Sequence, residues 1–260
     1  MKKIRLQAHR GVSTEAPENT LAAFQMAVDQ GYSIIELDTK YTKDGVCVVL
    51  HDPTLNRTCR LPGGDVIADE VNINDITLAE ALTFDAGIAM DARFTGEKIP
   101  TFAQMLDFFK KNNIACKVDN VWESFTPEQK DDFIELVKNS DAKSKIGFSC
   151  QNLENLKRVV KEVPECEIHW DGALDDEILE NVKKIAKNHR LTFWIRFDNK
   201  TTSWSKFPYA TPELCDKVRK FGEIGVWILS TNEELDKTVS EFKPDAIETT
   251  GAIKPRMIEK

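Results

Sequence analysis

The repeating unit of this chain is clearest in residues 145–170, KIGFSCQNLENLKRVVKEVPECEIHW. Its two ends, KIGFSC and CEIHW, are short apolar runs with a β-rich composition. The segment between them, NLENLKRVVKEV, places its apolar side chains on one face of a helix. A strand, a helix and a second strand in this order predict two parallel strands joined by a crossover helix.

The same unit extends in both directions along the chain. We predict strands at IRLQAH (4–9), SIIELD (33–38), ACKVD (115–119), KIGFSC (145–150), CEIHW (166–170), TFWIRF (192–197), GVWILS (225–230) and DAIET (245–249). Helical spacing predicts helices at residues 20–31, 101–113, 127–139, 152–163, 175–189 and 212–222. About eight strands alternating with helices predict an α/β fold, the TIM (β/α)8 barrel, with residues 1–260 as a single barrel domain.

One segment interrupts this alternation directly after SIIELD. YTKDGVCVVLHD (41–52) contains two short strands around Asp44-Gly45, which predicts a hairpin. A hairpin that follows the carboxyl end of a barrel strand can carry His51 back toward the catalytic face of such a barrel. Residues from about 53 to 100 are too many for a connecting loop, so we expect a small insertion after the second barrel strand.

Composition excludes several classes of protein. The 260 residues carry a net charge of -8, which argues against binding nucleic acid by releasing counterions from phosphates. The six cysteines are scattered without ligand spacing, so we expect buried free thiols.

The ends and apolar runs of the sequence bear on location. No stretch has the length of a membrane span, and the start MKKIRLQAHRG lacks the apolar region of a signal peptide. We therefore predict a cytoplasmic protein, although a sequence from which a signal peptide had been removed would look the same.

Two carboxylates follow each other at the end of the second predicted barrel strand. Glu36 and Asp38 are two residues apart, so their side chains point to the same face of the strand. They repel each other unless a positive charge lies between them, and a hard cation such as Mg²⁺ or Ca²⁺ binds through oxygen ligands.

Histidine and arginine side chains are expected near these acids. His9 and Arg10 follow the first predicted strand, and the hairpin brings His51 to the same face. Cleavage of a phosphodiester needs one group to accept a proton, another to donate one, and positive charge around the phosphate. Two histidines, a cation and Arg10 supply these functions.

These residues belong to motifs that are recognisable in order and spacing. The motifs are HRG (9–11), PENT (17–20), ELD (36–38), TKDG (42–45), HDPTLNRT (51–58), GEKIPTFAQML (96–106), GFSC (147–150), VWILSTN (226–232) and PDAIETTG (244–251). They resemble those of the glycerophosphodiester phosphodiesterase family, most strongly over residues 8–58 and least between 160 and 222. The resemblance implies a TIM barrel, a divalent cation and catalysis by two histidines.

Carried over residue by residue, the resemblance implies that His9 and His51 are the acid–base pair and that Arg10 is a phosphate ligand. It implies that Glu36 and Asp38 are the metal ligands, and that Glu18 and Asn19 are supporting residues.

The third barrel strand departs from the family's pattern, which is a Glu that binds the metal, a hydrophobic residue, and a Lys that contacts phosphate. Here the strand is IACKVD (114–119). Aligning the lysines places Ala115 at the Glu position and keeps Lys117 as the phosphate contact, which is the alignment we prefer. A shift by two residues places Lys117 at the Glu position and Asp119 at the Lys position. We predict that Asp119 supplies the missing metal ligand, unless it pairs with Lys117.

Aromatic residues of the last strands are candidates for a substrate wall. Trp227, together with Trp194 and Phe197, either lines the alcohol end of the substrate or simply packs in the barrel. His169 and His189 are left outside the predicted catalytic set.

We therefore predict metal-dependent hydrolysis of a small glycerophosphodiester to glycerol 3-phosphate and an alcohol. One alternative is a phosphodiesterase that acts on a lysophospholipid or a sugar phosphodiester. Another is a barrel that binds phosphodiesters without cleaving them. The sequence does not indicate the oligomeric state.

Overall fold

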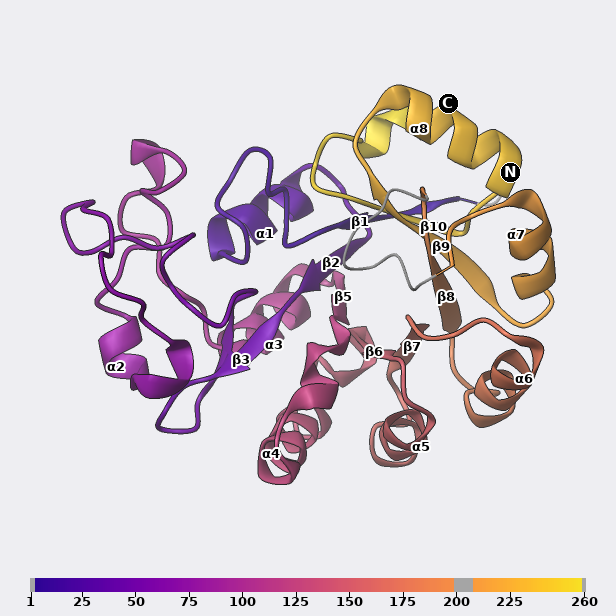
Figure 1. Cartoon of the computed structure of the whole chain (residues 1–260), viewed down its shortest axis with the longest axis horizontal. Helices are drawn as coiled ribbons and strands as arrows, with labels where there is room; N and C mark the ends of the chain where they lie inside the picture. The colour runs from indigo at the N-terminus through magenta and orange to yellow at the C-terminus, as the bar shows by residue number, and fades with distance from the viewer. Residues whose placement is uncertain (1–2, 199–207, 259–260) are drawn as a thin grey trace.

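The computed structural model describes residues 3–198 and 208–258, in which eight parallel strands close into a barrel (Figure 1). The barrel strands are β1 (Arg5–Ala8), β2 (Ile34–Leu37), β5 (Ala115–Val118), β6 (Ile146–Cys150), β7 (Glu167–Trp170), β8 (Leu191–Arg196), β9 (Glu223–Leu229) and β10 (Ala246–Thr249). Each overlaps one of the predicted strands. Their order around the barrel follows the chain, since β1 pairs with both β2 and β10, and the predicted TIM barrel is confirmed.

Helices surround the barrel (Figure 1). They are α1 (Leu21–Asp29), α3 (Phe102–Asn112), α4 (Pro127–Lys138), α5 (Leu153–Glu162), α6 (Asp176–Ile185), α7 (Pro212–Val218) and α8 (Asn232–Lys237). Threonine hydroxyls accept hydrogen bonds from first-turn N–H groups at several helix starts, which fixes where the helices begin. We did not predict α8, because its six residues bury only Leu235 and so carry little apolar periodicity.

The hairpin forms where it was predicted, with β3 (Thr39–Tyr41) antiparallel to β4 (Cys47–Val49). The segment 53–100 follows it and contains α2 (Leu78–Ala81) and two short 3-10 turns. Its buried apolar side chains form a small cluster with Val48 and Leu50 of the hairpin, separate from the main core. In Figure 1 this segment extends to the left, beyond β3.

The barrel has an apolar outer side and a polar interior. Leu6, Cys116, Ile168 and Phe193 belong to the main apolar core. Because side chains alternate along a strand, their neighbours Gln7, Lys117, His169 and Thr192 point to the other side, into the barrel, and all four are buried. Among these interior groups, the guanidinium of Arg5 donates to Glu167 at 2.7 Å and to Glu223 at 3.1 Å, pairing of the kind that burial of a charge requires.

Two expectations about the chain's environment can be compared with the structure. All six cysteines are buried and free, as predicted. Within residues 3–198 and 208–258, no helix has the length and apolar character needed to cross a membrane.

Gly11 permits a close contact between the loop after β1 and helix α1. Its φ is +81°, and a Cβ there would lie 2.7 Å from the Cβ and 2.8 Å from the carbonyl carbon of Ala23. We expect Gly11→Ala to lower the free energy of unfolding by about 3 kcal/mol through overlap and backbone strain. Gly45 has a similar φ of +78° but open space around it, so Gly45→Ala should cost only about 1 kcal/mol. If urea denaturation showed that both variants lose the same free energy of unfolding, the packing argument for Gly11 would be contradicted.

Candidate active site

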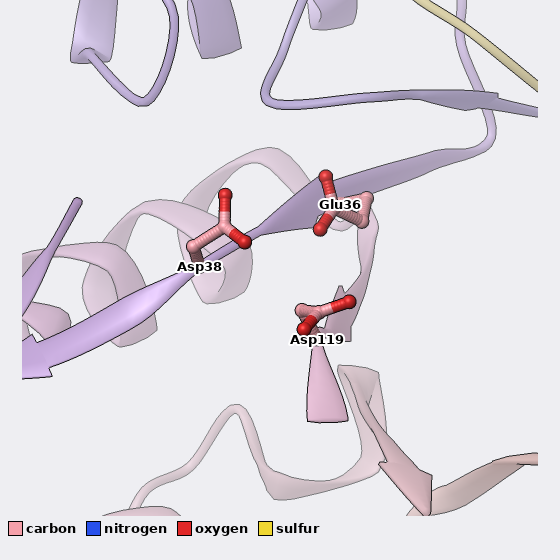
Figure 2. Close-up of side chains that lie close together, drawn as sticks. All are labelled: Glu36, Asp38 and Asp119. Atoms are coloured by element: carbon pink, nitrogen blue, oxygen red, sulfur yellow. The ribbon is translucent and has the colours of Figure 1, made fainter. Parts of the chain in front are cut away.

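Three carboxylates meet at the carboxyl end of the barrel (Figure 2). Glu36, Asp38 and Asp119 each offer an oxygen, and these atoms lie within 4.8 Å of one another. Burial, followed by the charges of Asp38, Glu248 and Asp119, raises the pKa of Glu36 well above its usual value. Burial and the nearby Asp38 raise the pKa of Asp119 to about 6. A compact group of two buried acids and one half-buried acid, all with oxygen ligands, fits a hard divalent cation such as Mg²⁺ or Ca²⁺.

The strand register explains why Asp119 reaches this cluster. Glu36 pairs with Lys117, and Ala115 pairs with Ile34. The backbone N–H of Asp119 donates to the carbonyl of Leu37 at 3.0 Å, which brings Asp119 beside Asp38. A carboxylate at position 115 would start two residues below Glu36, whereas Lys117 lies beside Glu36 and Asp119 lies beside Asp38, directly after β2. This register supports the prediction that Asp119 supplies a metal ligand, and the choice between the two alignments stays a prediction.

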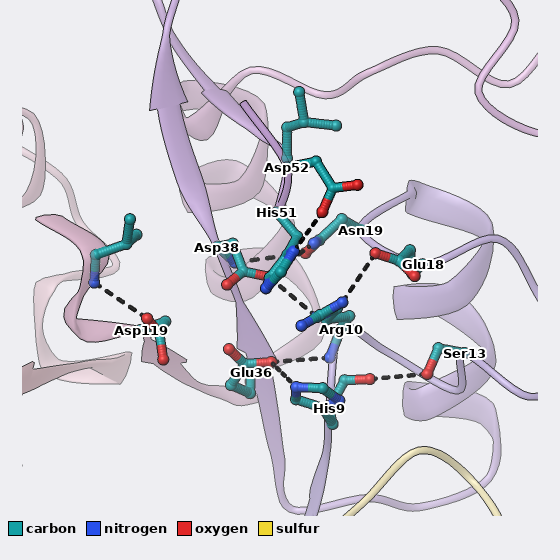
Figure 3. Close-up of polar contacts among 12 residues, drawn as sticks. His9, Arg10, Ser13, Glu18, Asn19, Glu36, Asp38, His51, Asp52 and Asp119 are labelled. Atoms are coloured by element: carbon teal, nitrogen blue, oxygen red, sulfur yellow. Dashed lines mark hydrogen bonds and ion pairs between the residues drawn. The ribbon is translucent and has the colours of Figure 1, made fainter. Parts of the chain in front are cut away.

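The two histidines flank the carboxylates from different loops (Figure 3). His9 follows β1, and its Nε2 lies 3.9 Å from Glu36 and 4.0 Å from Glu248. Burial, followed by the charges of Arg10 and Lys117, lowers the pKa of His9. His51 follows β4, and the N–H of Leu50 donates to the carbonyl of Asp38 at 3.1 Å, which ties the hairpin to the end of β2. The structure thus brings the predicted acid–base pair to one face.

Arg10 and the predicted supporting residues form one hydrogen-bonded group with the acids (Figure 3). The backbone N–H of Arg10 donates to Glu36 at 2.9 Å, and its guanidinium lies 3.1 Å from Glu18 and 3.3 Å from Asp38. Arg10 adopts a left-handed φ of 57°, which turns its side chain toward these acids. The Asn19 amide donates to Asp38 at 2.9 Å. Glu18 and Asn19 therefore fix the positions of Arg10 and Asp38.

Two further residues, Asp52 and Arg57, were not singled out from the sequence. The Nδ1 of His51 lies 2.6 Å from Asp52, and the Nε of Arg57 donates to Asp52 at 2.6 Å. Arg57 also donates twice to Glu18, at 2.7 and 2.8 Å. Both residues lie in the HDPTLNRT motif, and a carboxylate next to a candidate catalytic histidine was a signal that could have identified Asp52.

The hydrogen bonds to Asp52 make a pH-dependent contribution to stability. The hydrogen bond from Arg57, together with that from His51, lowers the pKa of Asp52 to about 2. Because the pKa of an Asp in an unfolded chain is about 3.9, these bonds stabilise the folded protein fully above that pH, and the contribution disappears as the pH falls toward about 2. We expect Asp52→Asn to lower the free energy of unfolding near neutral pH, with the difference from wild type shrinking below about pH 4. Urea denaturation of both proteins between about pH 7 and pH 2 tests this prediction. A difference in the free energy of unfolding that does not change with pH would contradict it.

Lys117 is buried beneath the carboxylates. Its ammonium lies 3.3 Å from Asp171 and 3.9 Å from Glu248, and above the ring of Trp194 at 4.9 Å. Sequence reasoning did not identify Asp171 or Glu248. Both come at the end of a predicted strand, the position that had identified Glu36 and Asp38.

The other aromatic and histidine candidates lie in different places. Trp194 is buried in the barrel and donates to Nδ1 of His169 at 2.9 Å, so it packs there rather than lining the mouth. Trp227 is half-buried near the end of β9, and Phe197 packs against the core. His189 bonds the carbonyl of Cys166 at 2.9 Å, beside the start of β7.

Comparison with known proteins identifies relatives of this chain. The sequence profile of the glycerophosphoryl diester phosphodiesterase family matches residues 9–209. A glycerophosphodiester phosphodiesterase from Caldanaerobacter subterraneus is 33% identical over 162 residues, 62% of this chain and 63% of the relative. One from Bacillus subtilis is 34% identical over 118 residues, 42% of this chain and 38% of the relative. The chain thus aligns with less than two thirds of the length of either.

Solved structures resemble the whole barrel. An Oleispira antarctica phosphodiesterase in complex with the product sn-glycerol-3-phosphate has a TM-score of 0.75 and 21% identity, covering 99% of this chain and 96% of that one. A glycerophosphodiester phosphodiesterase from Thermotoga maritima has a TM-score of 0.63 and 23% identity, covering 96% of this chain and 95% of that one. At these identities the likeness establishes the fold.

Proposed function

The chain belongs to the glycerophosphoryl diester phosphodiesterase family, and on the basis of its site we propose that it hydrolyses glycerophosphodiesters to glycerol 3-phosphate and an alcohol. The observation that carries this proposal is the grouping of Glu36, Asp38 and Asp119 within 4.8 Å, flanked by His9, Arg10 and His51. These are the groups that phosphodiester hydrolysis requires.

The acids and Arg10 have complementary roles in this proposal. Glu36, Asp38 and Asp119 would hold a divalent cation, Mg²⁺ or Ca²⁺, which would supply positive charge to neutralise the phosphate oxygens. Arg10, held by Glu18 and Asp38, presents a fixed positive charge to the same oxygens. Asn19 fixes the orientation of the Asp38 carboxylate through its hydrogen bond of 2.9 Å, as residues behind metal ligands do.

The histidines carry out the proton transfers. Because Asp52 binds Nδ1 of His51 at 2.6 Å, the ring orientation is fixed and Nε2 is left to exchange a proton with substrate. The His51 side chain is 38% exposed, so substrate can reach it, whereas that of His9 is 17% exposed and faces Glu36. One histidine takes the proton of the attacking water, and the other gives a proton to the leaving alcohol.

Some assignments from the sequence stay predictions. A phosphate contact by Lys117 would have to share its ammonium with Asp171 and Glu248. A substrate contact by Trp227 and a cytoplasmic location rest on the sequence alone.

The proposal is tested by incubating the purified chain with glycerophosphoethanolamine and Mg²⁺ or Ca²⁺ and following phosphorus NMR. We expect the diester signal to convert to that of glycerol 3-phosphate. If the chain cleaved only a lysophospholipid or a sugar phosphodiester, it would be a phosphodiesterase with that substrate instead. Binding of diesters without conversion would contradict hydrolysis and favour a binding barrel.

A further inference from the structure

A pocket of about 600 Å³ opens beside the candidate active site. Asp38, His51 and Asp119 form the end of the pocket at the site. The rest of the lining consists of Lys40, Asn120, Val121, Glu123, Ser124, Gln151, Asn152 and Asn155. His9 and Arg10 do not line it. The pocket therefore lies on the His51 side of the site and has a volume suited to a small-molecule ligand. It is much larger than a glycerol unit alone requires.

The outer lining of this pocket is polar. Among the described residues that line it there is no Trp, Tyr or Phe, and Val121 is the one aliphatic residue. Trp122, the next residue in the chain, is fully buried and donates to the carbonyl of Ser149 at 2.7 Å, so its ring faces the core. Side-chain amides of Asn120, Gln151 and Asn155 supply donors and acceptors that match hydroxyl groups. Quaternary ammonium groups are instead recognised by aromatic faces.

Lys40 is the positively charged residue of the lining. It lies on β3, two residues after Asp38, and its ammonium is 3.4 Å from the carbonyl oxygens of Thr39 and Leu50. Within the described part of the chain it forms no ion pair, in contrast to Lys117, which is held by two carboxylates. The carboxylate of Glu123 in the same pocket accepts the backbone N–H groups of Gln151 and Asn152, and so it is engaged with the protein itself.

We propose that this pocket binds the leaving alcohol, and that Lys40 makes it selective for polyhydroxylated alcohols, such as glycerol or a sugar-like polyol, over choline. This inference rests on the proposed phosphodiesterase function and names its substrate class. The ammonium of Lys40 donates hydrogen bonds to hydroxyl groups, and it repels a quaternary ammonium placed in the same space. The amides of the outer lining complete the hydrogen bonds of the remaining hydroxyls.

The test compares kcat/KM for glycerophosphoglycerol, glycerophosphoinositol and glycerophosphocholine in the wild type, Lys40→Gln and Lys43→Gln. Lys43 is an exposed lysine of the same hairpin outside the pocket lining, so its variant loses the same charge nearby. We expect the wild type to prefer both polyol substrates over the choline one. In Lys40→Gln the ratio of polyol to choline kcat/KM should fall about tenfold, because a charge-assisted hydrogen bond is lost, and in Lys43→Gln it should not change.

The outcomes separate this inference from the proposed function. If all three diesters are cleaved but choline is preferred, or if Lys40→Gln lowers kcat/KM for every substrate equally, the pocket assignment is wrong and the hydrolase remains. If no diester is cleaved, the proposed function fails. Calorimetric dissociation constants for the same diesters then decide the pocket: tighter polyol binding that depends on Lys40 supports it, and equal binding overturns it.

Discussion

Replacing His51 with alanine is expected to lower kcat for release of glycerol 3-phosphate by about 10²- to 10⁴-fold, the usual contribution of a positioned acid or base. The His51 ring is held by Asp52 at 2.6 Å. His51 does not belong to the candidate cation site, which consists of Glu36, Asp38 and Asp119. Affinity for the cation should therefore be unchanged in this variant. Steady-state kinetics at saturating cation, with calorimetric titration of Mn²⁺, measure the two quantities separately.

His189 provides a matched control for this variant. It bonds the carbonyl of Cys166, near the start of β7 and remote from the site. His189→Ala should keep near-wild-type kcat. A His51→Ala enzyme with wild-type kcat, or one that has lost its cation affinity along with kcat, would show that His51 does not act in proton transfer.

The second large effect is expected for Asp119→Asn, which should weaken cation binding by at least about a hundredfold. Loss of residues that merely orient metal ligands costs about 10- to 100-fold, so neutralising a direct ligand should cost more. Asp119 also accepts the N–H of Val121 at 3.0 Å, and an asparagine oxygen can keep this bond. The change therefore removes the charge with little effect on the local backbone. Calorimetric titration with Mg²⁺ or Mn²⁺ measures the affinity.

Asp141 is the corresponding control. It is an exposed carboxylate that pairs with Lys110 on the surface, away from the cluster. Asp141→Asn should bind the cation as the wild type does. If Asp119→Asn also kept wild-type affinity, the cation would be held by Glu36 and Asp38 with water and substrate oxygens, and Asp119 would not be a ligand.

The sequence was sufficient for the barrel because each unit carries its own local signal. Apolar runs such as KIGFSC and amphipathic segments such as NLENLKRVVKEV differ in period, and this difference separates strands from helices. The hairpin followed from Asp44-Gly45 and the two short strand-like runs on either side of it. Helix α8 was missed because a six-residue helix with one buried side chain has no such period.

The sequence predicted best those site residues whose placement depends on alternation along a single strand. Glu36 in β2 and Asp38 directly after it follow from the alternation of side chains along the extended segment SIIELD. The register between β2 and β5 depends on how two strands far apart in the chain are paired, which local patterns do not determine. For this reason the sequence left two alignments of IACKVD open, and the structure was needed to bring Asp119 beside Asp38. The contacts of Lys117 with Asp171 and Glu248 likewise arise only when the barrel closes.

The most direct test of the account is the release of glycerol 3-phosphate by the wild type and His51→Ala, first in EDTA and then as Mg²⁺ is restored. The account predicts no release by the wild type in EDTA, recovery as the cation is added, and little release by His51→Ala at any cation concentration. Release that proceeds equally in EDTA, or that is equal in the two proteins, would contradict it.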